Sequence, residues 1–139
     1  MVSVVISGGQ TGADRAALDA ALVLGIPHGG WVPKGRRDEN GTIPAVYLGL
    51  VDADSDDPAV RTRLNVRDSD GTVVLSHGPL TGGSALTGDV ARELGRPWLH
   101  LDLRTGGVQA AASTLVAWLA ANSVSRLNVA GPVKLFSCR

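Results

Sequence analysis

The sequence predicts an α/β fold: a single Rossmann-like domain over residues 1–139, with an open, mostly parallel sheet and helices on both faces. Short β-branched runs alternate with helix-like segments along the whole chain, as in parallel strands joined by crossover helices. Two predicted helices end alike, in LGIP at residues 24–27 and in LGRP at residues 94–97, which suggests a repeated unit. The 18 glycines include many in short clusters between the periodic segments, which favours tight turns in a compact domain.

In the first half of the chain, the run VSVVIS at residues 2–7 has the composition of a buried parallel strand. A helix is predicted over 11–24, where Thr11 and Asp14 have the spacing of a capping box and Gly25 provides the stop. The remaining segments are predicted as a weak strand over 26–32, a loop over 33–44 and an acidic, solvated stretch over 52–57.

In the second half, Asp57 and Pro58 mark the start of a short helix that runs to about residue 67. The prediction then continues with a turn over 68–71, a buried strand over 72–76, a helix over 81–94, a strand over 98–103, a helix over 107–122 and a last strand over 126–131. The apolar face of the last helix carries Val108, Ala111, Ala112, Leu115 and Leu119.

The composition argues against several function classes. A formal net charge of +0 argues against nucleic acid as a partner, and no segment is long and apolar enough to span a membrane. The single cysteine, Cys138, suits a reducing compartment, so we expect a cytoplasmic protein. The residues His28, His77 and His100 lack metal-ligand spacing, and no G-x-S-x-G element is present. We therefore expect no protein-ligated metal and assign no catalytic residue.

Glycine-rich segments follow three predicted strands at their carboxyl ends, where open α/β sheets bind ligands. The first, SGGQTG, opens a helix, and its backbone N–H groups suit an anion. A tight turn with a helix cap and an arginine salt bridge would use the same residues, so both interpretations stay open. Neither G-x-G-x-x-G nor a Walker lysine is present, so the motif specifies neither NAD nor ATP. Its candidate binding residues are Gly8, Gly9, Gln10, Thr11, Gly12 and Arg15.

A second glycine segment, SHGPLTGGSALTG, offers several hydroxyl groups around a glycine pair before another helix. A helix cap would explain one hydroxyl, whereas the set of hydroxyls favours ligand binding. Its candidate residues are Ser76, Thr81, Gly82, Gly83, Ser84 and Thr87.

The segment WVPKGRR contributes an aromatic ring and positive charge. Trp31 could stack on a flat ring while Lys34 and Arg36 contact an anion; an exposed basic loop is the alternative. Farther along, Asn65 and Asp68 share one helix face with Arg61. This face could line the predicted ligand-binding crevice, but the spacing on its own favours an ordinary solvated face.

Five segments, in this order and spacing, resemble the molybdenum cofactor carrier protein-like family: SGGQTGADRAALDAA, GGWVPKGRRDENGTIP, RTRLNVRDSDGTVVLS, LTGGSALTGDVA and LNVAGP. That family is part of a Rossmann-like superfamily that includes the lysine-decarboxylase-like, cytokinin-activating phosphoribohydrolases. The resemblance covers about residues 4–132. It implies a pocket for molybdenum cofactor, a phosphorylated pterin that carries molybdenum. It also implies molybdoenzymes as recipients and a homo-oligomer, either a dimer or a tetramer.

The resemblance also implies roles by position. It gives a first anion loop, charge from Lys34 and Arg36, and a second loop that starts at Thr81; a polar rim would consist of Asn65, Asp68 and Ser69. Two departures stand out. Relatives often carry cysteine where this chain has Val32, and an Arg and a Ser are expected after Pro132, where the chain reads VKLFSCR.

Two other function classes fit the same motifs. The phosphoribohydrolases carry P-G-G-x-G-T-x-x-E, whose glutamate assists cleavage of a nucleoside monophosphate; the aligned residue here is Asp89. A shorter carboxylate in a loop where Ala85 and Leu86 replace Gly-Thr makes that enzyme the second choice. A nucleotide-sensing module without catalysis is the third.

Overall fold

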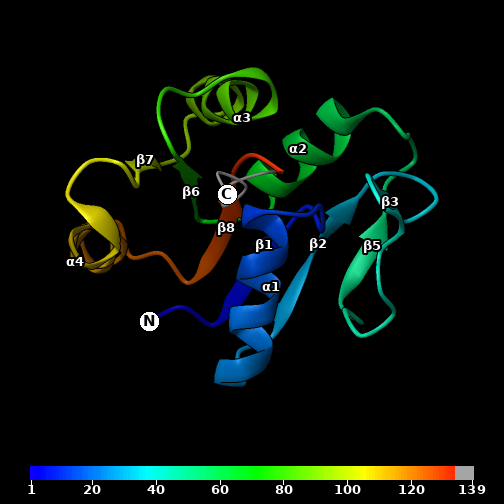
Figure 1. The fold of residues 1–139 in the computed structure, drawn as a ribbon, viewed down its shortest axis with the longest axis horizontal. Coiled ribbons are helices and arrows are strands. Elements are labelled where there is room, and N and C mark those ends of the chain that lie inside the picture. The colour runs from blue at the N-terminus through cyan, green and yellow to red at the C-terminus, as the bar shows by residue number, and fades with distance from the viewer. Residues whose placement is uncertain (134–139) are drawn as a thin grey trace.

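The structure is a computed structural model that describes residues 1–133, so Cys138 and the departure after Pro132 fall almost wholly outside the described residues. Its centre is a six-stranded sheet in the order β5-β2-β1-β8-β6-β7, with every pair parallel (Figure 1). The strands are β1 Val4–Ser7, β2 His28–Val32, β5 Leu50–Asp52, β6 Gly71–Ser76, β7 Trp98–Asp102 and β8 Arg126–Ala130.

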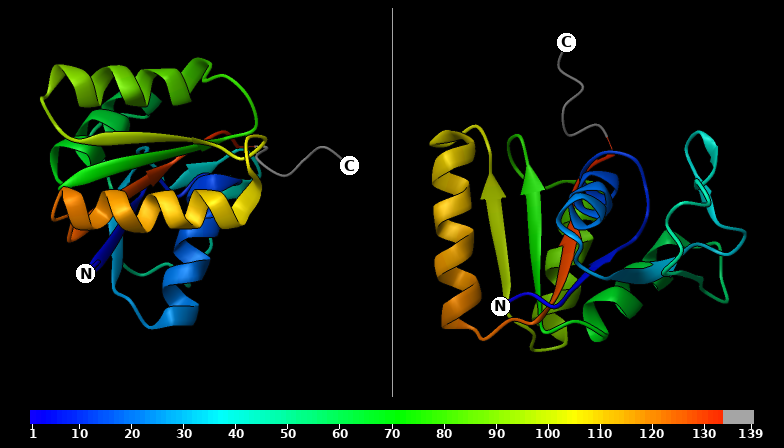
Figure 2. Two further views of the ribbon diagram at one scale, coloured as in Figure 1. Left: turned by 90° about the vertical axis from the view of Figure 1, so that its left-hand side faces the viewer. Right: turned by 90° about the horizontal axis from the view of Figure 1, so that it is seen from below.

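Helices cover both faces of the sheet (Figure 2). On one face lie α1 Ala13–Leu24 and α4 Gly107–Ala121, and on the other lie α2 Pro58–Arg67 and α3 Gly82–Glu93. This arrangement confirms the predicted Rossmann-like fold. β8, the last strand in the sequence, lies between β1 and β6, so the strand order reverses at that point. Such a reversal leaves a crevice at the carboxyl ends of the strands, because neighbouring connections leave in opposite directions.

Apolar side chains alternate along the central strands and form a core on each face. Under α1 and α4, the largest cluster is built from Val5, Ala21, Val73, Leu101, Val124, Leu127 and Val129. Between α2, α3 and the sheet, Val66, Val90 and Ala91 pack together with Leu86 and Trp98. Both clusters fix the helix axes relative to the strands. They thereby position the N-termini of α1 and α3, which face the crevice.

The segment 33–52 has more regular structure than predicted. The predicted loop holds a small antiparallel hairpin of β3 Arg37–Asp38 and β4 Gly41–Thr42. Beyond it, β5 extends the sheet and pairs with β2, so Asp52 of the predicted acidic stretch ends a strand. Both elements have only two or three residues, too few for a periodic pattern in the sequence.

The helix starts partly differ from prediction. Asp57 caps α2 as predicted, since its carboxylate accepts a hydrogen bond from the Ala59 N–H at 3.0 Å. The helix α1 begins at Ala13 instead of Thr11, with Gly12 at the N-cap. Thr11 does not cap the helix, because its hydroxyl contacts Glu39 and the Val133 carbonyl. The predicted capping box is therefore wrong on both sides, because Asp14 Oδ2 accepts the N–H of Gln10, one residue before Thr11, at 3.3 Å.

The last helix, α4, also departs from its predicted packing. Ala111, Leu115 and Leu119 of the predicted apolar face pack against the core, but Val108 is 71% exposed. Val108 in the first turn and Ala112 one turn later are therefore exposed, contrary to the prediction.

Candidate anion-binding crevice

The carboxyl ends of β1, β8 and β6 open into three adjoining hollows, here called the crevice. Two of them have volumes of about 300 Å³ and 220 Å³, and the third is a narrow slot beside Gly8. Shared residues join them: Thr81, Ser84 and Pro132 line both larger hollows. The lining comprises Gly8, Asp14, Arg61, Thr62, Asn65, Ser76, His77, Thr81, Gly82, Gly83, Ser84, Thr87, Asn128 and residues 130–133, together with Pro79, Leu80 and Val129.

The N-terminus of α3 forms one wall of the crevice. Thr81 is the N-cap residue, yet its side chain makes no capping hydrogen bond within the described residues. A Cβ added at Gly82 or Gly83 would meet no described atom within 4 Å, so the space over this glycine pair is open. The first N–H groups of a helix have no partner in the helix itself and attract anions. This wall therefore provides donors and room for an anionic group.

Of the three hydroxyls predicted to bind ligand, one already has a local partner. Thr87 donates to the Gly83 carbonyl one turn earlier, at 2.9 Å, although the residue still lines the crevice. Ser84 and Thr81 line both larger hollows. The residues of the predicted second loop from Thr81 to Thr87 thus contribute to one hollow of the crevice.

A buried ion pair forms the wall opposite α3. Arg61 reaches from α2 toward Asp14 of α1, with 3.6 Å between Nη1 and Oδ2, and their side chains are 18% and 4% exposed. The Arg61 Nε is buried and has no hydrogen-bond partner within residues 1–133. A buried cationic donor without a partner is costly, so Arg61 is well suited to receive an anion in the crevice.

Asp14 is strongly affected by this environment. Burial raises the pKa of its carboxyl group to about 6, against the opposing effects of Arg61, the Gln10 N–H and Arg15. Gly8 makes room for the pair, because a Cβ there would lie 2.2 Å from Arg61 Nη1 and 2.9 Å from Asp14 Oδ2. Asp14 and Arg61 were not predicted as site residues. Two features of the sequence could have identified them: an acidic residue in the first helical turn after a glycine loop, and an arginine one turn before Asn65.

The first glycine loop mostly contacts protein. Gln10 donates from Nε2 to the carbonyls of Gly8 and Arg37, and Arg15 pairs with Asp38 at 2.5 Å. Gly9 and Gly12 are closely packed: a Cβ would lie 2.9 Å from Val32 Cγ1 or 2.3 Å from the Pro132 carbonyl oxygen, respectively. The side chains of Gln10, Thr11 and Arg15 hold the β3–β4 hairpin. Among the predicted residues of this loop, Gly8 is the one that lines the crevice.

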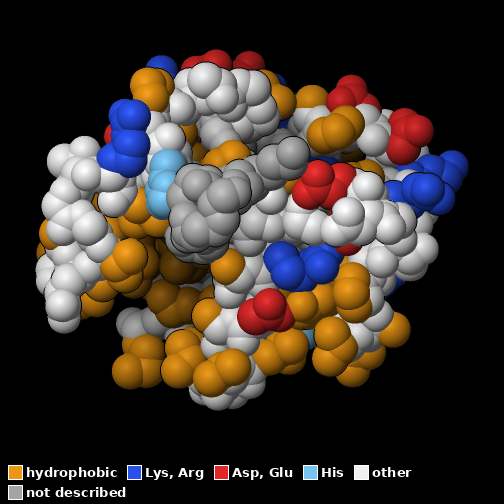
Figure 3. Space-filling model, viewed as in Figure 1, with side chains coloured by type: hydrophobic (Ala, Val, Ile, Leu, Met, Phe, Trp, Pro, Cys, Tyr) orange, Lys and Arg blue, Asp and Glu red, His pale blue; other side chains and the backbone are white. Residues whose placement is uncertain are grey.

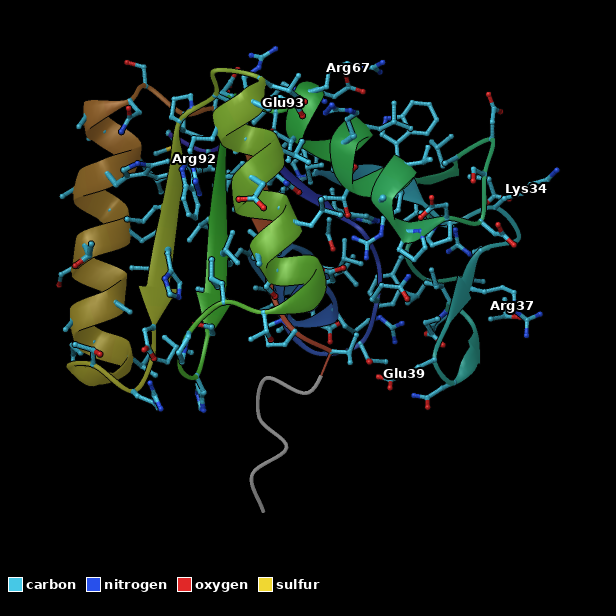
Figure 4. All side chains as sticks on the ribbon, turned by 90° about the horizontal axis from the view of Figure 1, so that it is seen from above. Lys34, Arg37, Glu39, Arg67, Arg92 and Glu93 are labelled. Carbon is cyan, nitrogen blue, oxygen red and sulfur yellow. The ribbon has the colours of Figure 1, made fainter. Side chains whose placement is uncertain are left out.

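The basic segment lies away from the crevice. Figure 4 shows Lys34 and Arg37 pointing outward at the far side of the molecule from α4. Arg36, with a positive φ of 55°, donates to the carbonyls of Ile43, Pro44 and Tyr47, so its guanidinium fixes the hairpin.

Trp31 lines a separate hollow on the α2 face, next to His28 and Arg126. Asn65 accepts the Trp31 N–H at 2.7 Å and donates to its carbonyl, and Asp68 accepts the indole N–H at 2.8 Å. Two of the three predicted rim residues therefore hold β2 against α2, and Asn65 also borders the slot of the crevice. The third, Ser69, donates to the Val66 carbonyl and is buried.

At the end of β6, the buried Ser76 hydroxyl lies 2.7 Å from His100 Nε2 and 2.6 Å from the Gly78 carbonyl. This contact with His100 on the neighbouring strand was missed, since strand register is not visible in the sequence. Asp89 is different: it is exposed, lies 3.6 Å from Arg92, and is absent from the described lining of the crevice. Figure 4 shows Arg92 on the same helix, α3, on the side toward β7, with Glu93 on the side toward α2.

Within residues 1–133, no group of three or more His, Cys, Asp or Glu side chains could hold a metal ion. In the same part of the chain, no helix has the length and hydropathy needed to cross a membrane.

Comparisons with known proteins agree with the fold. Residues 5–135 match the model of the family described as "Circularly permutated YpsA SLOG family". A crystal structure at 1.45 Å, titled "Putative molybdenum carrier protein" from Syntrophus aciditrophicus SB, has a TM-score of 0.92 and 49% sequence identity. The match covers 94% of this chain and 82% of that one. None of the curated proteins matches the sequence. Because the family model matches residues 5–135, nearly the whole chain, the chain belongs to the circularly permuted YpsA family of SLOG proteins.

Proposed function

We propose that this protein binds molybdenum cofactor in the crevice, protects it and passes it to molybdoenzymes. One observation carries the proposal: Arg61, a partly buried arginine whose Nε has no hydrogen-bond partner in residues 1–133, lines a space of about 300 Å³ together with the open N-terminus of α3. A phosphate group needs such a set of donors. The name of the 49% identical relative supports the choice of ligand.

In this proposal, the phosphate of the cofactor binds to the backbone N–H groups of Gly82 and Gly83 and to Arg61. The rest of the ligand extends along Ser84, Thr81 and Ser76 toward the second hollow. When bound, the cofactor supplies a molybdenum centre, which the protein shields from solvent. Because Asp89 is exposed and paired on α3, the position of this carboxylate offers no support for phosphoribohydrolase chemistry. A chain with a single cysteine suits the cytoplasm, where we place this function.

The substitution Gly83→Asp tests the site. A carboxylate fits the open space and interacts favourably with the helix dipole, so α3 should stay folded. The same charge repels an anionic ligand, and we expect retained cofactor to fall at least tenfold. Native mass spectrometry of anaerobically purified protein, with added cofactor and separately with AMP, measures this loss.

The matched control is Ala45→Asp, which places the same charge on the exposed connection before β5, outside the lining of the crevice. Cofactor retention should then equal that of the wild type. Equal retention by the Gly83→Asp variant would overturn the site. Cleavage of AMP by a wild type that retains no cofactor would instead make the protein a hydrolase.

We also propose a homo-oligomer that forms through α4. The helix has no charged side chain, and its Val108 and Val116 are 71% and 66% exposed. Figure 3 shows hydrophobic side chains gathered in a hollow between α4 and α1. An exposed apolar surface without charges is typical of an interface between copies of one chain.

The substitution Val116→Arg places a charge on this face and should convert a dimer into a monomer, or a tetramer into a dimer. Light scattering coupled to size-exclusion chromatography measures the mass. The control is Leu48→Arg, because Leu48 is 85% exposed on the connection before β5, far from α4. A monomeric wild type, or an unchanged mass of the Val116→Arg variant, would refute this interface.

A further inference from the structure

The Asp14 carboxylate lies where a bound anion would compete with it. Asp14 lines both the slot and the larger hollow, and so does its partner Arg61. The distance of 3.6 Å between Oδ2 and Nη1 is longer than a charge-assisted hydrogen bond, so the guanidinium is not fully engaged. An anion bound to Arg61 therefore places two negative groups, the anion and the Asp14 carboxylate, beside one partly buried guanidinium. Like charges in such a place cannot both remain ionised without a large cost.

We propose that anion binding in the crevice is coupled to the uptake of one proton by Asp14. The inference rests on the proposed function, since it concerns the same site. The proton comes from solvent and leaves Asp14 as a neutral carboxylic acid. Arg61 is then released from its internal counter-charge and is available to the ligand. When the proton leaves, Asp14 regains its charge and competes with the ligand for Arg61, which favours release.

The groups around Asp14 are consistent with this coupling. From α2, Arg61 is the nearest cation, and Thr62 lines the same hollow; from α3, the neighbour is the neutral Thr87. Within α1, Arg15 lowers the pKa of Asp14 only weakly, because its guanidinium pairs with Asp38. The Gln10 N–H donates to Asp14 Oδ2 from the preceding loop. Burial outweighs these groups and raises the pKa of Asp14 to about 6 in the free protein.

The coupling fixes the direction of the pH dependence. Anion binding raises the pKa of Asp14 further, so affinity is highest at pH values below about 6 and falls as the pH increases. The fall ends above the pKa of the bound state, where no proton is taken up. Affinity changes tenfold for each unit by which the two pKa values differ.

Sulfate is the probe, because it keeps the same charge throughout the pH range and adds no titration of its own. Isothermal titration calorimetry between about pH 5 and pH 8, in buffers of different ionisation enthalpy, counts the protons taken up. We expect an uptake of about half a proton or more per sulfate near pH 6 to 7, and at least tenfold weaker binding at pH 8 than at pH 5. The variant Asp14→Asn imitates the protonated group, so its affinity should be independent of pH and equal to that of the wild type at pH 5.

Two controls separate Asp14 from other titrating groups. Asp89→Asn removes an exposed carboxylate of α3 and should keep the proton uptake, whereas His77→Gln removes the histidine of the crevice and tests whether that side chain takes up the proton in place of Asp14. Loss of the uptake in His77→Gln but not in Asp14→Asn would overturn the proposal.

Other outcomes are equally decisive. Sulfate binding by the wild type without proton uptake would overturn this inference and leave the proposed site intact. A lack of sulfate binding by the wild type at every pH would overturn the site itself. Should Asp14→Asn not fold, ¹³C NMR of the Asp14 carboxyl group in the wild type replaces it: sulfate should raise its pKa by at least one unit, and an unchanged pKa would refute the coupling.

Discussion

Replacing Arg61 with alanine is expected to weaken ligand binding by about 10- to 100-fold, the effect of losing one or two charge-assisted hydrogen bonds. Arg61 is the cation closest to Asp14 in the crevice wall, and its Nε is buried without a partner in residues 1–133. Calorimetry with sulfate, and cofactor retention in native mass spectrometry, measure the loss. Arg61→Lys should recover part of the charge but not the planar set of donors, and so part of the affinity.

A stability change must be separated from this loss of binding. Without Arg61, Asp14 stays buried without its counter-charge and takes up a proton, which costs on the order of 1–3 kcal/mol near neutral pH. The double variant Arg61→Ala/Asp14→Asn removes that cost, so it should fold like the wild type and still bind weakly. The control on the same helix is Arg63→Ala, whose partner Glu93 is 60% exposed. Wild-type affinity in the double variant would exclude Arg61 from the site.

The substitution Gly30→Ala is expected to have the largest effect on stability. A Cβ at Gly30 would lie 2.1 Å from the Ser7 carbonyl oxygen and 2.8 Å from the Ser7 nitrogen, both of them backbone atoms. The backbone of β1 cannot move aside, because it is paired with β2 on one side and β8 on the other. Gly30 also has a φ of 136°, which alanine rarely adopts. We expect a loss of about 4 kcal/mol or more in the free energy of unfolding.

The neighbouring residue provides the control. A Cβ at Gly29 would make its nearest contact with the Gly49 carbonyl oxygen, at an ordinary 3.6 Å. Gly29→Ala should therefore change the free energy of unfolding by less than about 1 kcal/mol. Urea denaturation followed by circular dichroism compares the two variants. Equal stability of both would show that the approach of β2 to β1 does not depend on Gly30.

The fold could be predicted because its main signals are local. The β-branched runs of β1 and β6 and the glycine stops after α1 and α3 depend on residues close in the sequence. Elements of two or three residues, such as β5 and the β3–β4 hairpin, have no period to detect. They form because distant groups fix them, as Arg36 does with its three backbone carbonyls.

The candidate site was predicted in part. The second loop was correctly placed at the sheet edge, since a glycine pair before a helix determines an open N-terminus. The first loop was predicted to bind the ligand, whereas Gln10, Thr11 and Arg15 donate hydrogen bonds to the hairpin. No pattern in the sequence distinguishes a donor that meets a ligand from one that meets a backbone 27 residues away.

The sequence by itself determined the order of strands and helices, the parallel sheet, and the edge of that sheet at which the glycine segments gather. Only the tertiary structure decided that Arg61 of α2 meets Asp14 of α1 beneath Gly8, and that Trp31 lies in a different hollow. The physical reason is range. Strand and helix signals depend on neighbours within a few residues. The burial and charge that give Asp14 and Arg61 their chemistry depend on contacts across 47 residues of chain, the difference between positions 61 and 14.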